Sequence, residues 1–333
     1  METDILIVGA GPAGCAAAIE ACRSGLSVVV LEASRDYRAS PGETLHPGVE
    51  PLLKQLGILT SVLAERFHRH CGIWVEWEGA RHFQSYGKDE SGPWFGFQAE
   101  RRRLHSIMLK AASDAGAIVV RPLISDRLLR HGARVRGVHT AGRDYLARWT
   151  LDATGRSAWM AKALELRQVR CSPRLNARFF WKRTDFEQLG NEPTFAASAE
   201  GWIWEAPLGN CTARVELRIV DPEYPPTGSA GIDLTWRIHP ACAGPGYFML
   251  GDAAATLDPA SSHGVLRALM SGIFSAHLAT ACVNGILPEI AAAAAYRSWT
   301  SGQFSADTSA LRILYARHPV QKIAQAFGSY ETD

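Results

Sequence analysis

The sequence predicts an α/β fold that opens on a parallel sheet and has antiparallel sheet inserted later. First, residues 5–8 form a continuous apolar run, typical of a strand buried on both faces of a parallel sheet. Second, a glycine-rich turn and a helical stretch follow it, and a second apolar strand spans residues 27–31. Third, stretches rich in aromatic and β-branched residues lie within residues 72–97 and 170–237.

The turn after the first strand carries Gly9, Gly11 and Gly14 in G-x-G-x-x-G spacing. In such a turn, one glycine allows the tight bend, one lets the backbone approach a pyrophosphate, and one allows close helix–strand packing. The helix that follows offers unpaired N–H groups and a positive dipole end to phosphates. Glu32 ends the second strand, where its carboxylate can bond a ribose hydroxyl. The pattern predicts FAD or NAD rather than NADP; the alternative is a βαβ unit that binds no nucleotide.

The composition excludes several classes of protein. A chain of 333 residues with a formal net charge of +2 can hold two domains, and it gives no indication of nucleic acid or an anionic membrane as a partner. We expect neither a signal peptide nor a membrane span. The seven cysteines are scattered and odd in number, which favours reduced thiols and a cytoplasmic protein. His68, His70 and Cys71 lie close together, but no second ligand cluster has suitable spacing, so no metal site is expected.

The remaining patterns give the expected elements. Helical spacing and stop signals predict helices at residues 49–56, 101–115 and 265–282, and a helical C-terminal part from residue 288. Strands are expected at residues 73–77, 94–97, 118–120, 126–130, 135–140, 149–151 and 247–250. The arginines at 101–103 are by themselves a solvated helix face.

The order of the motifs resembles that of a known family. These motifs are G-x-G-x-x-G, the distal Glu32, a helix led by Arg101, D-A-T-G at residues 152–155, and a late Gly251-Asp252 followed by D-P-x-S. Together they resemble the FAD-dependent monooxygenases of the p-hydroxybenzoate hydroxylase fold, over essentially the whole chain. The resemblance implies a three-layer, Rossmann-like FAD-binding domain and an inserted, mainly antiparallel β-sheet substrate domain. The FAD-binding domain would comprise residues 1–71, 99–168 and 240–333, and the substrate domain residues 72–98 and 169–239.

By position, the resemblance also implies roles for single residues. The three glycines would approach the FAD pyrophosphate, Glu32 the adenosine ribose, and Asp252 the ribityl chain. A helix that begins after Ser262 would stabilise negative charge on the flavin ring with its N-terminus. The implied FAD-binding residues are Gly9, Gly11, Pro12, Ala13, Gly14, Glu32, Thr44, Arg101, Asp252, Ser262, Gly264 and Val265.

Two branches of the fold share further motifs with this chain. The G-E-T sequence at residues 42–44 and W-x-W-x-x-P at residues 202–207 resemble motifs of flavin-dependent tryptophan halogenases. The lysine that those enzymes carry after the G-E-T loop has no counterpart here, which disfavours halogenation. Residues 42–53 and 258–265 resemble the flavoprotein maturases of tryptophylquinone-containing amine and amino-acid oxidases, of the glycine-oxidase or lysine-oxidase branch. That resemblance implies oxygenation of a tryptophan side chain in a partner's precursor.

The candidates for catalysis are His46, Glu43 and His263. A histidine suits proton transfer near neutral pH, although His46 is equally a loop histidine that bonds a backbone group. Arg267 is a candidate for binding substrate through a carboxylate, or is simply solvated. Trp202 and Trp204 share one face of a strand and either line a substrate chamber or pack in the core.

The predicted activity is FAD-dependent hydroxylation of a tryptophan side chain in a quinone-enzyme precursor. FAD would be reduced by a transiently bound NAD(P)H or by an external reductase, and O2 would supply the oxygen. One alternative is a flavin-dependent hydroxylase or reductase of a small aromatic or prenyl substrate. Another is a flavin-binding assembly factor without catalytic turnover.

Overall fold

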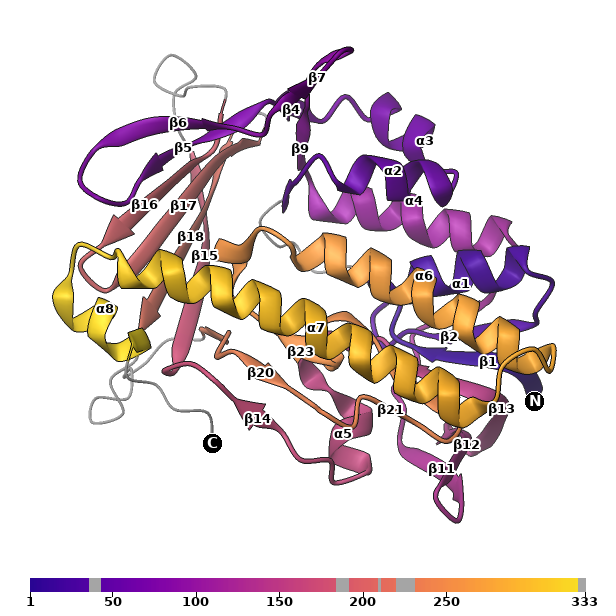
Figure 1. Ribbon diagram of the computed structural model, residues 1–333. Coiled ribbons are helices and arrows are strands. Elements are labelled where there is room, and N and C mark those ends of the chain that lie inside the picture. Colours follow the sequence, from indigo (N-terminus) through magenta and orange to yellow (C-terminus); the bar gives the residue numbers. More distant parts are fainter. Residues whose placement is uncertain (36–42, 184–191, 209–210, 220–230, 329–333) are drawn as a thin grey trace.

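The computed structural model describes residues 1–35, 43–183, 192–208, 211–219 and 231–328. Helices pack on a parallel sheet at one end of the molecule, and a second, mainly antiparallel sheet lies at the other end (Figure 1). The predicted fold class is confirmed. Its described helices are α1 (Pro12–Arg23), α2 (Val49–Gln55), α3 (Leu59–Ala64), α4 (Arg101–Asp114), α5 (Trp159–Ala163), α6 (Gly264–Val283), α7 (Glu289–Ala316) and α8 (Gln321–Gly328).

The sheet at the N-terminal end has eight strands among the described residues, in the order β10-β2-β1-β13-β12-β11, with β22 on β13 and β21 on β22. The five central strands from β10 to β22 run parallel. The strands are β1 (Glu2–Val8), β2 (Val28–Leu31), β10 (Ile118–Val120), β11 (Arg127–His131), β12 (Arg134–Thr140), β13 (Arg143–Asp152), β21 (Ala243–Gly244) and β22 (Tyr247–Met249).

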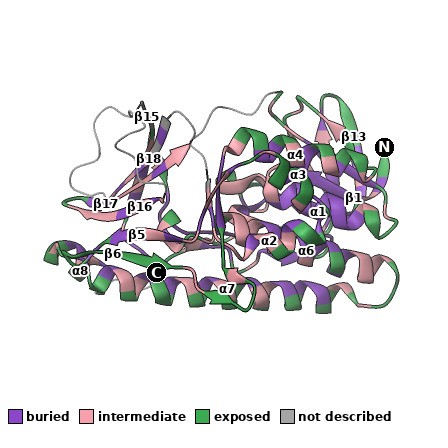
Figure 2. Cartoon of the chain, turned by 90° about the horizontal axis from the view of Figure 1, so that it is seen from above, coloured by how far each residue is buried: buried purple, intermediate pink, exposed green. Residues whose placement is uncertain are grey.

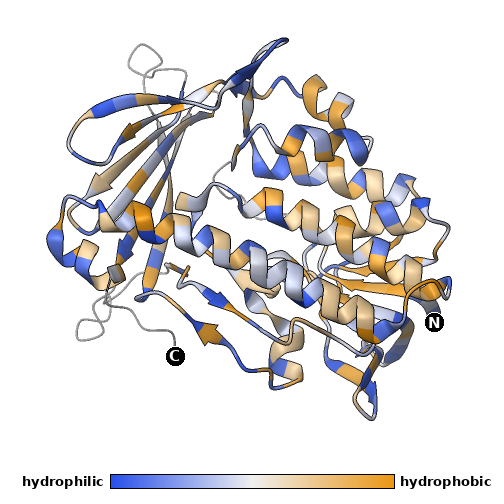
Figure 3. Cartoon of the chain, in the orientation of Figure 1, coloured by the Kyte–Doolittle hydropathy of each residue, from blue (hydrophilic) through white to orange (hydrophobic). Residues whose placement is uncertain are grey.

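This parallel sheet is buried on both faces, as its apolar sequence predicts. Ile5, Leu6 and Ile7 have no exposed surface, and burial of each such side chain stabilises the fold by about 2 kcal/mol. Buried residues therefore gather in β1 and α1 (Figure 2), and the strands beside the N-terminus are predominantly apolar (Figure 3). The carboxyl ends of β1 and β13 lie side by side, because Val8 pairs with Asp152.

The second large sheet, which we call the roof sheet, has seven strands among the described residues, in the order β19-β15-β18-β17-β16-β5-β6. Its strands pair antiparallel except β16 with β5. The strands are β5 (Gly72–Glu76), β6 (Arg81–Ser85), β15 (Leu175–Arg183), β16 (Thr194–Ser198), β17 (Gly201–Leu208), β18 (Cys211–Ile219) and β19 (Ile232–Asp233).

Smaller sheets join these two parts. One contains β3 (Glu43–Leu45), β9 (Gly96–Ala99) and β4 (His68–His70), and another contains β14 (Val169–Arg170), β20 (Arg237–Ile238) and β23 (Ala255–Thr256). The hairpin of β7 (Lys88–Asp89) and β8 (Gly92–Pro93) projects from β6. Short 3-10 turns are η1 (Gly155–Ser157), η3 (Gly251–Ala253) and η4 (Pro259–Ser261). The predicted division into two domains stays a prediction.

The expected helices are confirmed within two residues as α2, α4 and α6. The expected strand at residues 94–97 is wrong in its first half, because Trp94 and Phe95 lie between β8 and β9. The Trp94 ring covers Gly87 and its Nε1 donates to Asp89 Oδ2 at 2.9 Å, so this residue closes the hairpin instead.

Among the described residues, α6 is the one helix long and apolar enough to cross a membrane by length and composition. Here it packs against α1 as part of the core over the parallel sheet. The long helix α7 extends from the parallel sheet to the roof sheet (Figure 1). At one end Tyr296 Oη donates to Met249 O at 2.8 Å, and at the other Trp77 Nε1 donates to Leu314 O at 2.8 Å.

Candidate functional site

A cavity of about 700 Å³ lies between the carboxyl edge of the parallel sheet, the start of α6 and the roof sheet. Its wall includes Gly11 of the first turn, Glu32 after β2, and Asp252 after β22. The two ends of the predicted cofactor path thus open onto one space. The volume lies within the range of ligand-binding pockets, about 300 to 1,000 Å³.

The glycines of the first turn have different surroundings. Gly9 has a φ of +101°, and a Cβ on it would lie 2.4 Å from Ala153 O. A Cβ on Gly14 would lie 2.1 Å from Gly9 O, so this position keeps α1 close to β1. At Gly11 a Cβ would meet no atom within 4 Å. Gly9 and Gly14 therefore shape the turn, whereas Gly11 leaves room in the cavity for a phosphate group to approach the backbone.

Glu32 is held rigidly beside this turn. One carboxylate oxygen accepts from Ala10 N at 2.7 Å and the other from Ser34 N at 2.8 Å. Each carboxylate oxygen has a further lone pair for a ribose hydroxyl. The first turn, the α1 N-terminus with Pro12 in its first turn, and Glu32 together fit the adenosine end of FAD.

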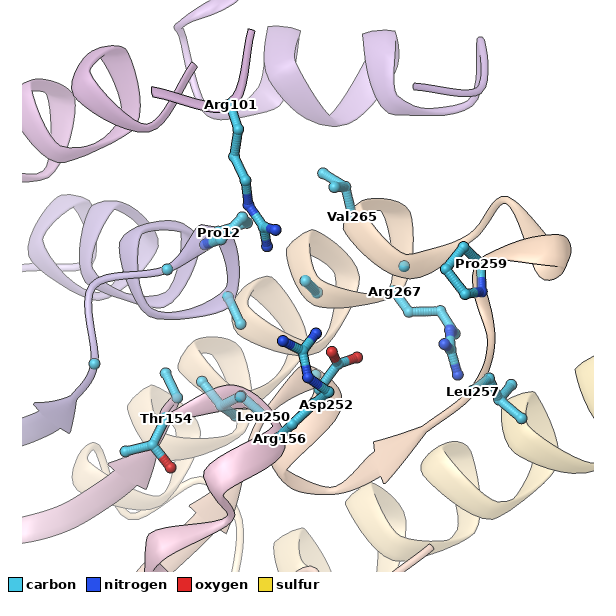
Figure 4. A pocket seen from close by; sticks show the side chains of 18 of the residues that line it. Pro12, Arg101, Thr154, Arg156, Leu250, Asp252, Leu257, Pro259, Val265 and Arg267 are labelled. Atoms are coloured by element: carbon cyan, nitrogen blue, oxygen red, sulfur yellow. The ribbon is translucent and has the colours of Figure 1, made fainter. Parts of the chain in front are cut away.

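Two arginines and one carboxylate face the middle of the cavity (Figure 4). Arg101 extends from the start of α4 toward Pro12, on the side where the family resemblance expects the cofactor. Arg156 extends from η1, and its head group lies beside the Asp252 carboxylate. Sequence reasoning missed Arg156, although it follows D-A-T-G at the carboxyl end of a parallel strand, where ligand-binding groups gather.

The D-A-T-G motif itself has a structural part. The buried Asp152 accepts from Thr154 N at 2.9 Å and from Met160 N at 2.8 Å, which fixes the loop that presents Arg156. Burial raises the pKa of Asp152. Its carboxylate is therefore directed at the backbone of this loop rather than at a ligand.

We call residues 258–263, which lead into α6, the flavin loop. Ser262, Gly264 and Val265 line the cavity at the N-terminus of this 20-residue helix. No side chain caps the helix start, so its first N–H groups and dipole favour negative charge in the cavity. This arrangement fits a flavin ring whose reduced form carries negative charge.

The structure places the three catalytic candidates differently. His46 lines the cavity, and its Nδ1 accepts from Gly48 N at 3.1 Å. Burial, and secondarily the nearby His263, lower the pKa of His46. His263 is not among the lining residues; its Nδ1 lies 3.0 Å from Asp307 Oδ1 and its ring centroid 6.0 Å from that of His46. Glu43 pairs through its backbone in β3, and its side chain lies outside the described part of the chain.

The other motif residues between β2 and α2 are partly described. Thr44 lines the cavity, and its hydroxyl donates to Gln98 Oε1 at 3.0 Å. Pro41 and Gly42 lie outside the described residues. The G-E-T loop therefore contributes Thr44 and His46 to the described wall.

The far part of the cavity is apolar, and we call it the aromatic chamber; its wall contains Ile73, Phe179, Phe195, Trp202, Trp204, Val215, Leu234 and Leu257. Trp202 is 1% exposed and donates from Nε1 to the Tyr315 hydroxyl at 2.9 Å. It therefore packs in the core and lines the chamber at once, so both interpretations drawn from the sequence apply to it.

Arg267 lines the cavity from the first turn of α6 and is mostly buried. Its Nε lies 3.4 Å from Asp307 Oδ2, so it is paired with a carboxylate of α7. Asp307 therefore holds both Arg267 and His263. Nothing in the helical pattern of α7 marks Asp307, because its partners Arg267 and His263 lie 40 and 44 residues earlier in the chain.

Comparisons with known proteins agree with this geometry. Residues 2–175 match the family model described as FAD binding domain. The tryptophan 2-halogenase of Chondromyces crocatus is 27% identical over 91% of this chain and 66% of its own length. The flavin-dependent brominase Bmp2 superposes with a TM-score of 0.83 at 20% identity, covering 98% of this chain and 90% of the brominase. PqsL of Pseudomonas aeruginosa, a probable FAD-dependent monooxygenase, gives a TM-score of 0.79 at 16% identity over 99% and 100%.

The family model covers just over half of the chain, and the residues that it covers include the glycine-rich first turn and Glu32. The chain therefore belongs to the FAD-binding domain family and is an FAD-dependent oxidoreductase.

Proposed function

We propose that this protein is an FAD-dependent hydroxylase of an electron-rich aromatic ring. The observation that carries the proposal is a single cavity with two parts. One part presents the first turn, Glu32 and Asp252, which fit FAD, and the other is the aromatic chamber. The tryptophan 2-halogenase relative and the PqsL fold neighbour support it, since their names describe a halogenase and a probable monooxygenase.

Bound FAD, once reduced by NAD(P)H or by a reductase, supplies the activation of O2. The residues of the chain bind and orient. The first turn and α1 hold the pyrophosphate, Glu32 the ribose and Asp252 the ribityl hydroxyls. The N-terminus of α6 opposes negative charge on the ring. The aromatic chamber keeps water from the reacting groups and orients the substrate ring.

In this proposal His46 is a hydrogen-bond donor that orients an oxygen in the cavity. Its Nδ1 accepts a backbone hydrogen bond from Gly48, so a neutral ring carries its proton on Nε2. Because its pKa is lowered, the ring stays neutral at physiological pH and offers its Nε2–H as a hydrogen-bond donor to an oxygen in the cavity while keeping the proton.

Hydroxylation is favoured over halogenation by the cavity wall. No lysine is present among the described residues that line it, and the halogenase resemblance requires one. The name of the halogenase relative therefore supports an electron-rich ring as the substrate. It gives weaker support for transfer of a halogen to that ring.

A tryptophan side chain within a precursor protein is the narrower candidate substrate. A free amino acid needs partners for its carboxylate and its ammonium group. The described wall of the aromatic chamber, as defined above, contains no charged residue, and Arg267, which lines the cavity from the start of α6, is already paired with Asp307. An indole presented without these charges suits the chamber better. The segments that resemble the tryptophylquinone maturases, residues 42–53 and 258–265, contribute described residues to the wall of the cavity as a whole.

The test mixes chemically reduced, FAD-loaded protein with O2 and, separately, indole, free tryptophan and a quinone-oxidase precursor. Mass spectrometry then weighs each substrate. Gain of one oxygen on indole supports a hydroxylase of small rings, and gain on the precursor supports the maturase. Repeating the reaction with bromide and finding a brominated ring would overturn hydroxylation. Gain of two hydrogens by a prenyl substrate without O2 would instead identify a reductase.

A further inference from the structure

We propose that Asp258 and Tyr315 are positioning residues that set the height of the aromatic chamber by tying the flavin loop to the roof sheet. This inference rests on the proposed function only in its use of the chamber for a substrate ring.

Asp258 opens the flavin loop and has no exposed surface. Its Oδ1 accepts from Ala260 N at 2.8 Å, which shapes the turn η4 before α6. Its Oδ2 accepts from Trp236 Nε1 at 2.8 Å and from the Tyr315 hydroxyl at 3.0 Å. One carboxylate thus holds the loop that faces the flavin and two aromatic side chains from elsewhere in the fold.

Tyr315 extends this connection to the chamber wall. It is fully buried on α7, and its oxygen also accepts from Trp202 Nε1 at 2.9 Å. Its ring stacks on Phe327 of α8 with centroids 3.8 Å apart. The continuous path Asp258–Tyr315–Trp202 therefore runs from the flavin loop to a side chain of the chamber wall, and both of its ends line the cavity.

The network depends on the charge of Asp258. Two of the three groups around the carboxylate, Trp236 Nε1 and Ala260 N, can only donate. A protonated Asp258 could therefore donate only to the Tyr315 oxygen, which already accepts from Trp202. The ionisable groups that face it are Tyr315 on α7 and Arg267 on α6; Asp307 of α7 bonds Arg267 instead.

The Asp258 carboxylate becomes protonated within an experimentally accessible pH range. Burial raises the pKa of Asp258 to about 6, against the hydrogen bonds from Trp236, Ala260 and Tyr315, which lower it. Below that pH the link through Tyr315 must rearrange. We therefore expect the position of Trp202 over the substrate to change with pH.

Tyr315→Phe removes the hydroxyl and leaves the stacked ring, and Trp77→Phe is its matched control. Trp77 contacts Tyr315 edge to face at 5.9 Å and bonds the same helix through Leu314 O, but it does not contact Asp258. Both variants lose one polar atom from the same core, and Trp77→Phe also loses ring volume, so a purely structural effect should be at least as large in the control.

The first readout uses protein without FAD. Difference infrared spectra are recorded against pH, and Asp258→Asn identifies the carbonyl stretch of the protonated Asp258 carboxyl. The wild-type midpoint is expected at about 6. In Tyr315→Phe it should move up by about one pH unit, because a donor to the anion is lost. Trp77→Phe should leave it in place. An equal midpoint in wild type and Tyr315→Phe overturns the proposal, even if Asp258→Asn fails to fold.

The second readout uses FAD-loaded protein and indole as the probe, followed by the change in flavin absorbance. Tyr315→Phe should weaken indole binding by about tenfold while FAD affinity is unchanged. An equal loss in Trp77→Phe would contradict the positioning role. If wild type neither binds indole nor hydroxylates any ring, the proposed function fails, whereas the infrared shift still reports on the Asp258–Tyr315 link.

Discussion

The two halves of the cavity are built by different means. The nucleotide half is formed by backbone groups: the N–H groups of the first turn and of α6, with Glu32 fixed by Ala10 N and Ser34 N. The aromatic half is formed by side chains that depend on one another, such as Trp202 on Tyr315. A site formed by the backbone tolerates a substitution only where the new Cβ meets no neighbouring atom. A site formed by side chains can change its shape by substitution while the fold is kept. We therefore expect substitutions to alter substrate choice more readily than cofactor binding.

The largest expected effect comes from a pair of glycine variants, which test whether the nucleotide half depends on free space beside the backbone. Gly14→Ala places a Cβ 2.1 Å from Gly9 O and should cost about 3 kcal/mol or more in the free energy of unfolding. Gly11→Ala meets no protein atom, so its stability should match wild type while FAD binding weakens at least tenfold. Urea unfolding and FAD titration measure the two quantities. Normal FAD binding in Gly11→Ala would show that the phosphate does not approach this position.

His70 provides a second test, in the small sheet of β3, β9 and β4 and outside the lining residues of the cavity. Burial lowers its pKa to about 4 from 6.5, so the folded protein binds this proton less readily than the unfolded chain. Stability from this group is present above pH 6.5 and is lost as the pH falls toward 4, by about 3 kcal/mol in total. In His70→Gln, urea unfolding should show a shallower loss between these pH values. An identical slope in variant and wild type would contradict the assignment.

Asp252→Ala tests the corner where the halves meet. Loss of the carboxylate should weaken FAD binding by about tenfold, because the ribityl hydroxyls lose a charged acceptor. The matched control is Asp144→Ala, an exposed carboxylate on β13 far from the cavity wall. Retention of the yellow colour after gel filtration reports the result. Equal retention in both variants would count against a cofactor role for Asp252.

The smallest expected effect tests how the charge of Arg267 influences ligand choice in the aromatic half. Asp307→Asn removes the negative charge that neutralises Arg267 and keeps an oxygen for His263. The chamber should then bind indole-3-acetate several-fold more tightly relative to indole, since Arg267 is released to pair with a carboxylate. Competition between the two ligands measures the ratio. No change in the ratio would mean that Arg267 does not face the bound ring.

Local sequence patterns predicted the elements that form the nucleotide half, and the reason is physical. Glycine spacing, apolar runs and a terminal acid act over one βαβ unit, so the places of Gly9, Gly14 and Glu32 could be predicted from neighbours in the chain, while their roles toward FAD stay predictions. Arg156 could have been identified from the sequence for the same reason, since it lies in the turn η1 that follows β13. Local patterns also placed α4 and α6 correctly.

The aromatic half could not be predicted in the same way. Asp307, Tyr315 and Trp236 acquire their roles from contacts across 22 to 113 residues of chain. Helical periodicity marks Tyr315 as buried and gives no partner for its hydroxyl. His263 illustrates the same limit, because its loop was expected at the flavin while its ring pairs with Asp307. The proposed catalytic role of His46 stays a prediction.

Helix α7 has 28 residues and therefore a length of roughly 42 Å. It is a single rigid rod that is fastened to the parallel sheet at Tyr296 and to the roof sheet at Tyr315. One residue inserted between these points would rotate everything beyond it by about 100° and advance it by about 1.5 Å. The length of α7 between these two points therefore sets the spacing between the parallel sheet and the roof sheet. Insertions or deletions in this helix offer a direct way to change the depth of the cavity between them.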